Sequence, residues 1–178
     1  MHEEVLSFWF REIDPKLWWS AEPGFDELIR RRFLGLLQQA AAGELYAWRA
    51  TPQGRLAEVI LLDQFSRNVY RGTPQAFAQD PMALALAQEA VGAGALASLD
   101  PAESSFLLLP YMHSESRKIH VVAEALYREF APAGNYEFEL KHKAIIDRFG
   151  RYPHRNEVLG RASTPDELEF LKEPGSRF

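Results

Sequence analysis

The sequence predicts an all-α fold, a compact array of antiparallel helix pairs, from three observations. An N-cap residue stands before a proline, the preferred order at a helix start, in the Asp-Pro or Thr-Pro pairs at 14–15, 51–52, 80–81, 100–101 and 164–165. No segment alternates apolar and polar residues with Val, Ile and Thr enrichment, as a strand would. Apolar residues instead recur at helical spacing, most clearly at Ile119, Val122, Ala123, Leu126, Tyr127 and Phe130.

Capping signals and helical periods place the expected helices in order. Asp100 and Thr164 each have a glutamate three residues further on, which is the spacing of a capping box. Gly72 and Gly150 stand where a left-handed residue would end a helix, and APAGN at 131–135 reads as a turn. The expected helices span about 2–11, 24–42, 52–71, 80–93, 101–109, 114–131, 135–149 and 164–172.

Length and composition limit the classes of function. The 178 residues, 47% of them apolar, predict a single domain over 1–178. Twenty basic against 25 acidic residues give a net charge of -5, which argues against nucleic acid or an anionic membrane as a partner. The chain has no cysteine, so disulfides and thiolate chemistry are excluded. We expect a cytoplasmic protein without leader, membrane span or cofactor, and we leave its oligomeric state open.

The first polar motif is LLDQFSRNVYRG, residues 61–72. Its Asp63, Arg67 and Arg71 follow at i, i+4 and i+8 on one helical face, with Gln64 and Asn68 beside them, while the opposite face is apolar. Such a face can line a binding site. It can equally be solvated, in which case an Asp63 to Arg67 ion pair contributes only about 0.3–0.5 kcal/mol.

The second motif is LLLPYMHSES, residues 107–116. We expect Pro110 to end one helix and Ser114 to cap the next, which leaves His113 and Glu115 at the junction. Across a helix start these two can act as a general base with its orienting acid, or as metal ligands. No HExxH and no second ligand pair accompanies them, so the sequence predicts no metal site. A capping or core histidine is the alternative, and we expect a core position for His142.

The third motif is IIDRFGRYPHRNEVLGR, residues 145–161, with arginines at 148, 151, 155 and 161. Arginine suits planar, bidentate recognition of carboxylate or phosphate. The alternative is a lattice of ion pairs to acids elsewhere, such as those at 63, 115 and 147. Because the chain leaves its helix at Gly150, we expect Arg151 and Arg155 to come near Asp63, Arg67 and His113 and to hold an anion there.

Together these motifs, with VLSFWF and FDELIRRRF before them and LGRASTPDELEFL after, resemble the bacterial DUF924 family over nearly the whole chain. The resemblance implies an all-α, tetratricopeptide-like fold and no established activity. Two positions depart from similar sequences, which often carry proline in place of Ser66 and glutamine in place of His120. The chain therefore lacks the amide side chain that such sequences have at position 120. The polar residues that match the family motifs are Asp63, Gln64, Arg67, Asn68, Arg71, His113, Ser114, Glu115, His142, Arg148, Arg151, His154, Arg155 and Asn156.

Three functions stay open on the sequence. The leading hypothesis is a polar cleft, lined by these motif residues, that binds a small anionic ligand or an acidic peptide end. The second is an acid–base or hydrolytic enzyme that uses His113 or His154 with Asp63 or Glu115. The third is a purely structural network of ion pairs. Unpaired Arg and His in an open cleft would favour the first two, and a histidine–carboxylate pair at about 2.6–3.2 Å facing the cleft would favour the enzyme.

Overall fold

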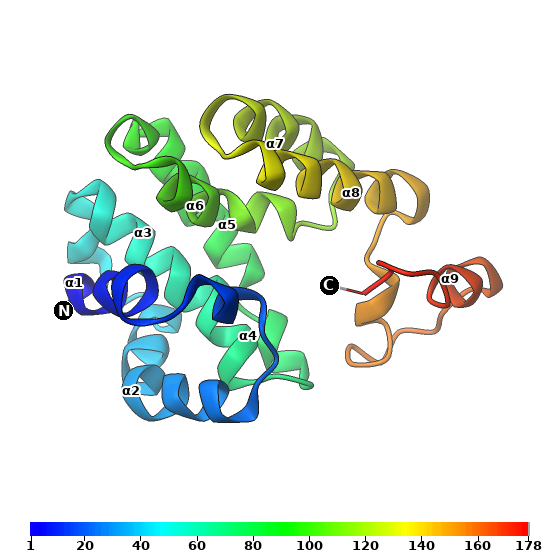
Figure 1. Ribbon diagram of the computed structural model, residues 1–178, viewed down its shortest axis with the longest axis horizontal. Helices are drawn as coiled ribbons and strands as arrows, with labels where there is room; N and C mark the ends of the chain where they lie inside the picture. The colour runs from blue at the N-terminus through cyan, green and yellow to red at the C-terminus, as the bar shows by residue number, and fades with distance from the viewer. Residues whose placement is uncertain (178) are drawn as a thin grey trace.

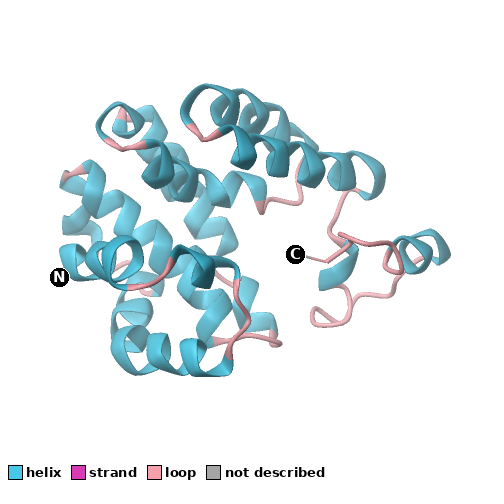
Figure 2. Cartoon of the chain, in the orientation of Figure 1, coloured by secondary structure: helices cyan, strands magenta, loops and turns pink. Residues whose placement is uncertain are grey.

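The computed structural model describes residues 1–177, which form helices and connecting loops without a strand (Figures 1 and 2). The prediction of an all-α fold is therefore confirmed. The α-helices are α1 (His2–Ser7), α2 (Pro23–Ala41), α3 (Pro52–Ile60), α4 (Ser66–Val69), α5 (Asp80–Gly92), α6 (Pro101–Met112), α7 (Arg117–Phe130), α8 (Ala133–Phe149) and α9 (Pro165–Phe170).

Shorter turns join or extend these helices. Two are π-helical, η1 (Phe8–Glu12) and η4 (Leu61–Phe65). The others are 3₁₀ turns: η2 (Pro15–Trp19), η3 (Tyr46–Ala50), η5 (Pro74–Phe77), η6 (Ala95–Ser98) and η7 (Pro153–Arg155). The Asp14-Pro15 pair thus starts only a 3₁₀ turn. The predicted helix 52–71 is α3, η4 and α4 in direct succession.

The capping signals behave as the sequence predicts. The side chains of Asp100 and Thr164 both form full capping boxes, at α6 and α9. Gly150 ends α8 with a φ of 72°, in the left-handed region that glycine adopts without strain. This turn directs the chain away from α8, so residues 150–177, the C-terminal segment, fold back toward the middle of the molecule (Figure 1).

The prediction that Pro110 ends a helix is wrong. Pro110 lies inside α6, which runs to Met112. Every residue from Ser104 to Met112 is buried, so tertiary packing outweighs the lost backbone bond of the proline. Ser114 is not a helix cap either. Ser116 precedes α7, and its side chain makes no capping bond.

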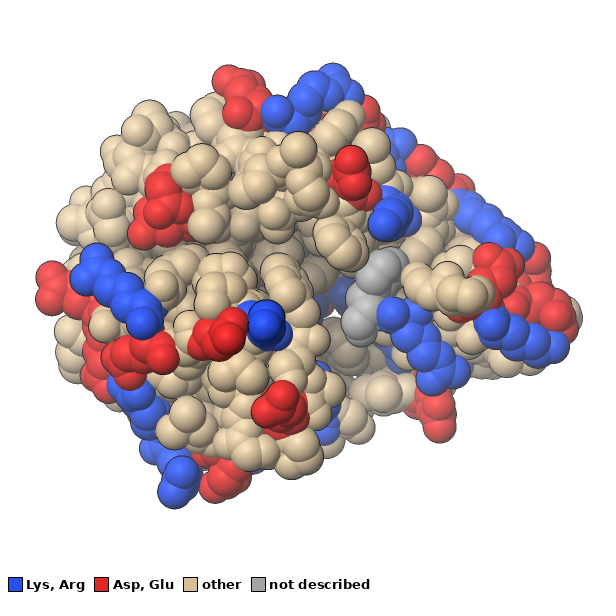
Figure 3. All heavy atoms as spheres, in the orientation of Figure 1, with Lys and Arg blue, Asp and Glu red and all other residues tan. Residues whose placement is uncertain are grey.

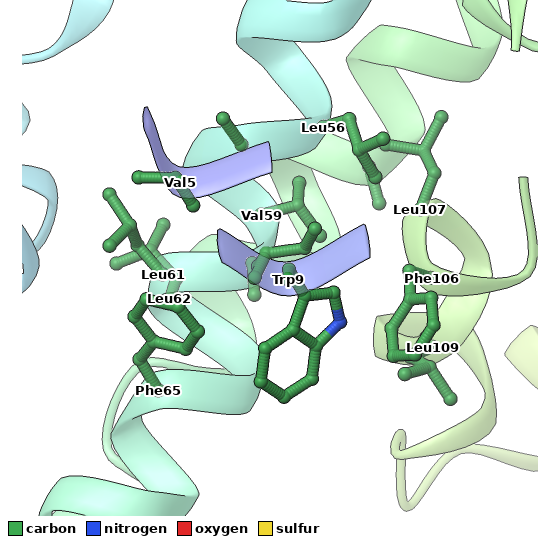
Figure 4. Packing of buried hydrophobic residues seen from close by; sticks show 14 of the residues in the cluster. Val5, Trp9, Leu56, Val59, Leu61, Leu62, Phe65, Phe106, Leu107 and Leu109 are labelled. Carbon is green, nitrogen blue, oxygen red and sulfur yellow. The ribbon is translucent and has the colours of Figure 1, made fainter. Parts of the chain in front are cut away.

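The main core lies among α1 to α7 and is centred on aromatic rings. The ring of Trp9 lies between those of Phe65 and Phe106, with centroid distances of 5.4 and 5.7 Å (Figure 4). A smaller cluster of Ile145, Ile146 and Tyr152 attaches the C-terminal segment to α8. Helix α7 packs against both α6 and α8, as expected for antiparallel helix pairs. The likeness to tetratricopeptide arrays stays a prediction.

Surface charge and helix length agree with the composition. Acidic and basic side chains are interspersed over the face of the molecule in Figure 3. Within residues 1–177, none of the helices is both long and apolar enough to cross a membrane.

Candidate functional site

A cleft of about 360 Å³ opens where four distant parts of the chain meet. Its walls come from η5, the first turns of α5, the end of α6 with the junction that follows, and the C-terminal segment. The lining residues are Pro74, Phe77, Ala78, Asp80, Pro81, Leu84, Pro110, His113, Ser114, Glu115, Arg155 and Leu159. The second and third motifs therefore do meet in space, as the sequence predicts.

Asp63 lies just behind the cleft on the π-helical turn η4. A π turn inserts an extra residue into the helical repeat and redirects the side chains after it, and such turns are frequent at functional sites. The Asp63 carboxylate is buried and accepts hydrogen bonds from Gln64 Nε2 at 2.6 Å and His113 Nδ1 at 2.7 Å. Arg67 Nη1 is 3.3 Å away. Burial opposes ionisation, but the charges of Arg67 and His113 and these bonds lower the pKa of Asp63 far below its usual range.

His113, which lines the cleft, is set up as a neutral base. Burial first, and then the positive charge of Arg67, lowers the pKa of its imidazole, against the raising effect of Asp63. Because the ionised Asp63 has no proton to donate, the proton between them belongs to Nδ1 of His113. The lone pair is then on Nε2, which bonds to no group among residues 1–177.

Two arginines converge on a single carboxylate at the start of α5. Arg67 makes a bidentate pair with Asp80, at 2.9 and 3.0 Å, and Arg155 Nη1 reaches the same carboxylate at 3.2 Å. The Arg155 guanidinium lies over the rings of Phe77 and Tyr152, 4.7 Å from each centroid. Its remaining donors, Nε and Nη2, have no acceptor in the described part of the chain, and Nε is fully buried. Arg155 is thus a buried cation with unused hydrogen-bonding capacity.

Glu115 lines the cleft but is fully engaged elsewhere. Its carboxylate makes a bidentate pair with Arg161, at 2.6 and 2.8 Å, and accepts the backbone N–H of Tyr152 at 2.8 Å. Burial would raise the pKa of Glu115, but Arg161 and this N–H lower it overall. It makes no bond to His113 within residues 1–177, so Asp63 is the carboxylate that orients His113.

Three further histidines do not line the cleft. His154 packs beside the Tyr152 ring, at 5.7 Å, and burial lowers its pKa to about 4. His142 bonds to the Phe138 carbonyl, and burial lowers its pKa to about 3. His120 is fully buried between Glu139 and the Ser114 carbonyl. A core position for His142 is what the sequence led us to expect.

The expectation that Arg151 reaches the cleft is wrong. Arg151 makes a bidentate pair with Glu167, at 2.6 and 2.7 Å, and bonds to the Ala162 carbonyl. Glu167 is held in place by its capping box at the start of α9, so the acid is fixed beside Arg151. Arg148 pairs with Asp166 at the surface. The acids that engage these two arginines follow the motif, whereas the sequence pointed to the acids at 63, 115 and 147.

Asn156 belongs to the same C-terminal lattice. Its amide oxygen accepts from Arg161 at 2.9 Å, and its amide nitrogen lies 3.0 Å from Ser163 Oγ and 3.3 Å from Glu167. Asn156 therefore does not line the cleft, contrary to expectation.

Asn68 and Arg71 also lie away from the cleft. Both bind Asp26 on α2, Asn68 at 2.8 Å and Arg71 at 2.6 and 2.8 Å. The sequence placed Asp63, Arg67 and Arg71 on one regular helical face. The π turn and the end of α4 at Val69 break that regularity, so only the first two stay together.

Asp80 is the main site residue that the sequence did not reveal. It was interpreted only as a cap before Pro81, but it is the first residue of α5 and its carboxylate joins Arg67 to Arg155. The apolar lining from Phe77, Leu84 and Leu159 was missed as well, because nothing in the local pattern distinguishes these from core residues. The need of two clustered arginines for a counter-ion was the available signal. Within residues 1–177, no group of three or more His, Asp or Glu side chains is placed to hold a metal ion.

Comparison with known proteins identifies the family but no activity. The family model described as a bacterial protein of unknown function, DUF924, matches residues 5–175, so the chain belongs to that family. It is similar to a solved structure of a protein of unknown function from Agrobacterium tumefaciens, with 33% identity, 96% coverage of each chain and a TM-score of 0.91. No curated protein matches the chain.

Proposed function

We propose that the protein binds a small anionic ligand in this cleft, with Arg155 as the group that holds the negative charge. The proposal rests above all on one observation. The side chain of Arg155 is only 7% exposed, yet its Nε and Nη2 have no acceptor among residues 1–177. A buried N–H without an acceptor costs about 1–3 kcal/mol, and a bound oxyanion would remove that cost.

A thermal-shift assay with paired variants tests this function. We expect acetate, phosphate or a larger carboxylate to raise the melting temperature of the parent protein, since a ligand at 100 times its Kd stabilises by about 2.7 kcal/mol. Arg155→Met should abolish the shift, and Arg148→Met, which changes an exposed arginine, should retain it. If no anion shifts the parent protein, or if the shift survives in Arg155→Met, the proposal is wrong.

A second candidate function is acid–base catalysis, which the Asp63–His113 pair favours. Asp63 keeps its charge and fixes the tautomer of His113, so Nε2 carries a lone pair as a general base requires. The candidate reaction is hydrolysis, in which Nε2 takes a proton from water while Arg155 stabilises the developing negative charge. His154 with Glu115 is less suited, because the Glu115 carboxylate is engaged by Arg161.

Hydrolysis of a panel of carboxylic and phosphate esters tests the second candidate. His113→Gln should abolish any turnover. The matched change Ser114→Ala, beside it in the cleft, should leave most of it. Because the pKa of His113 lies below its ordinary value, the rate should rise with pH and level off before neutrality. Turnover that His113→Gln leaves intact would rule out this role.

The purely structural alternative fits the charged residues that pair with one another outside the Arg155 site. Glu115, Arg151, Arg161 and Glu167 use their charged atoms on one another or on the backbone. We therefore assign the structural role to this lattice and the binding role to the cleft. A cytoplasmic location, and the absence of nucleic-acid and membrane partners, remain part of the proposal.

A further inference from the structure

The residues that line the cleft indicate which class of anion it binds. We propose that the ligand is a small monocarboxylate with an apolar tail, its carboxylate on the free edge of Arg155 and its tail against Phe77, Leu84 and Leu159. This inference rests on the proposed anion-binding function and names its ligand class. Three features carry it: the shape of the available donor, the charge balance of the site and the apolar lining.

The available donor fits a carboxylate. The Arg155 guanidinium lies over the rings of Phe77 and Tyr152 and donates from Nη1 to Asp80, so the edge formed by Nε and Nη2 remains available. Two parallel N–H groups on one edge match the two oxygens of a carboxylate. His113 adds a lone pair at Nε2 rather than a further N–H, so it does not help to surround an oxyanion with three or four oxygens.

The charge balance favours a single negative charge. Arg67 and Arg155 are opposed by Asp63 and Asp80, and Glu115 is neutralised by Arg161, so the site is close to neutral before a ligand enters. A monoanion adds one charge opposite Arg155. A phosphate monoester dianion would add two, beside the carboxylates of Asp80 and Glu115 in the same walls, and like charges at short range in a partly buried site are costly.

The rest of the cleft is apolar. Besides Phe77, Leu84 and Leu159, the lining includes three prolines and an alanine: Pro74, Pro81, Pro110 and Ala78. A volume of about 360 Å³ lies in the range of small-molecule sites, which are mostly apolar with a few polar groups that fix the orientation. A hydrocarbon tail bound in this space would remove from water both its own apolar surface and that of the lining residues.

A chain-length series on the unmodified protein is the first test, with acetate, butyrate, hexanoate and octanoate titrated by calorimetry at pH 7.5. We expect affinity to rise about two- to fourfold per buried methylene. Octyl sulfate, a monoanion of matched tail with three terminal oxygens, should bind up to about tenfold more weakly than octanoate. Octyl phosphate, a dianion at this pH, should bind at least about tenfold more weakly than octanoate. Arg155→Met should bind none of the carboxylates in this series.

A matched pair of leucine variants checks where the tail lies. Leu84→Asn should flatten the dependence of affinity on chain length. Leu168→Asn, which changes a leucine 52% exposed on α9, should keep the full dependence. Because the series on the parent protein needs no variant, the inference stays testable even if Leu84→Asn folds poorly.

The remaining outcomes separate this inference from the function it rests on. Anion binding that needs Arg155 but does not change with chain length would overturn the apolar tail and leave the proposed function standing. Tighter binding of octyl phosphate than of octanoate would overturn the monocarboxylate. Tighter binding of a peptide ending in leucine than of octanoate would overturn the small-molecule class. No binding of any of these anions would overturn the proposed function itself.

Discussion

Arg155 in the cleft and Arg151, four residues earlier, are both paired with carboxylates, but they differ in how many of their donors are used. Arg151 bonds through Nε and Nη2 to Glu167 and to a backbone carbonyl. Among residues 1–177, Arg155 makes one hydrogen bond, of 3.2 Å to Asp80, a carboxylate that Arg67 already binds at two points. The lattice is complete without a ligand, and the cleft is not.

This difference shows that a count of arginines does not distinguish a binding site from a structural lattice. Both regions come from the same motif, and both contain bidentate arginine–carboxylate pairs. What separates them is whether buried donors are left over and whether the residue that carries them lines a cleft. Variants in the two regions should therefore fail in different ways, the lattice in stability and the cleft in binding.

The largest effect is expected at the lattice. Arg151→Met leaves the Glu167 carboxylate, which is only 3% exposed, without its charged partner. We expect a loss of about 2–4 kcal/mol in the free energy of unfolding, because a buried charge without a partner is expensive. Urea unfolding of parent and variant measures this loss. A change below about 0.5 kcal/mol would mean that the lattice does not hold the C-terminal segment.

Acid should weaken the lattice through Glu167. The hydrogen bond from Arg151 is the main reason that the pKa of Glu167 falls to about 2 in the folded protein, against an ordinary value of 4.5. Its contribution to stability is then complete above about pH 4.5 and is lost as the pH falls toward 2. The difference in the free energy of unfolding between the parent protein and Glu167→Gln should be constant near neutral pH and should disappear in acid. Glu169→Gln, at an exposed position, should show no such difference.

In the cleft, Arg155→Met should change stability by less than about 1 kcal/mol. Asp80 keeps both bonds from Arg67, the buried N–H without an acceptor disappears, and methionine can pack against Phe77 and Tyr152. Urea unfolding beside Arg151→Met gives the comparison directly. If the two variants lose equal stability, then Arg155 belongs to the lattice and the distinction drawn between the regions is wrong.

The smallest effect concerns the protonation of His113. Since the Asp63 charge raises the pKa of His113 while burial and Arg67 lower it, Asp63→Asn should lower this pKa further. An NMR titration of the imidazole resonances measures the shift. Asp166→Asn changes an exposed acid that pairs with Arg148 and does not line the cleft, so this control should leave the titration of His113 unchanged. A rise of this pKa in Asp63→Asn would contradict the electrostatics described for the pair.

Much of the fold was predictable because its signals are local. Cap residues, prolines and the helical period fix where helices start and which face is buried, as the capping boxes at Asp100 and Thr164 illustrate. The exceptions arise where tertiary packing decides. Pro110 stays inside α6 because its neighbours are buried, and the π turn at Asp63 is invisible in the pattern of residues.

The candidate site was predictable only in part, for the same reason. The motifs correctly brought Asp63, Arg67, His113 and Arg155 together. They could not reveal which acid pairs with which arginine, because pairing depends on how the chain returns after Gly150. The sequence therefore wrongly placed Arg151 in the cleft and did not reveal that Asp80 lines it.

The most direct measurement of the central claim is the NMR signal of the Arg155 Nε–H group, assigned from its disappearance in Arg155→Met. We expect octanoate or acetate to shift the Arg155 Nε–H signal in a saturable way. The Nε–H signal of Arg151 should not shift, because this group is already bonded to Glu167. A titration in which Arg155 does not respond, or in which Arg151 responds instead, would contradict the claim that the cleft is completed by a bound anion.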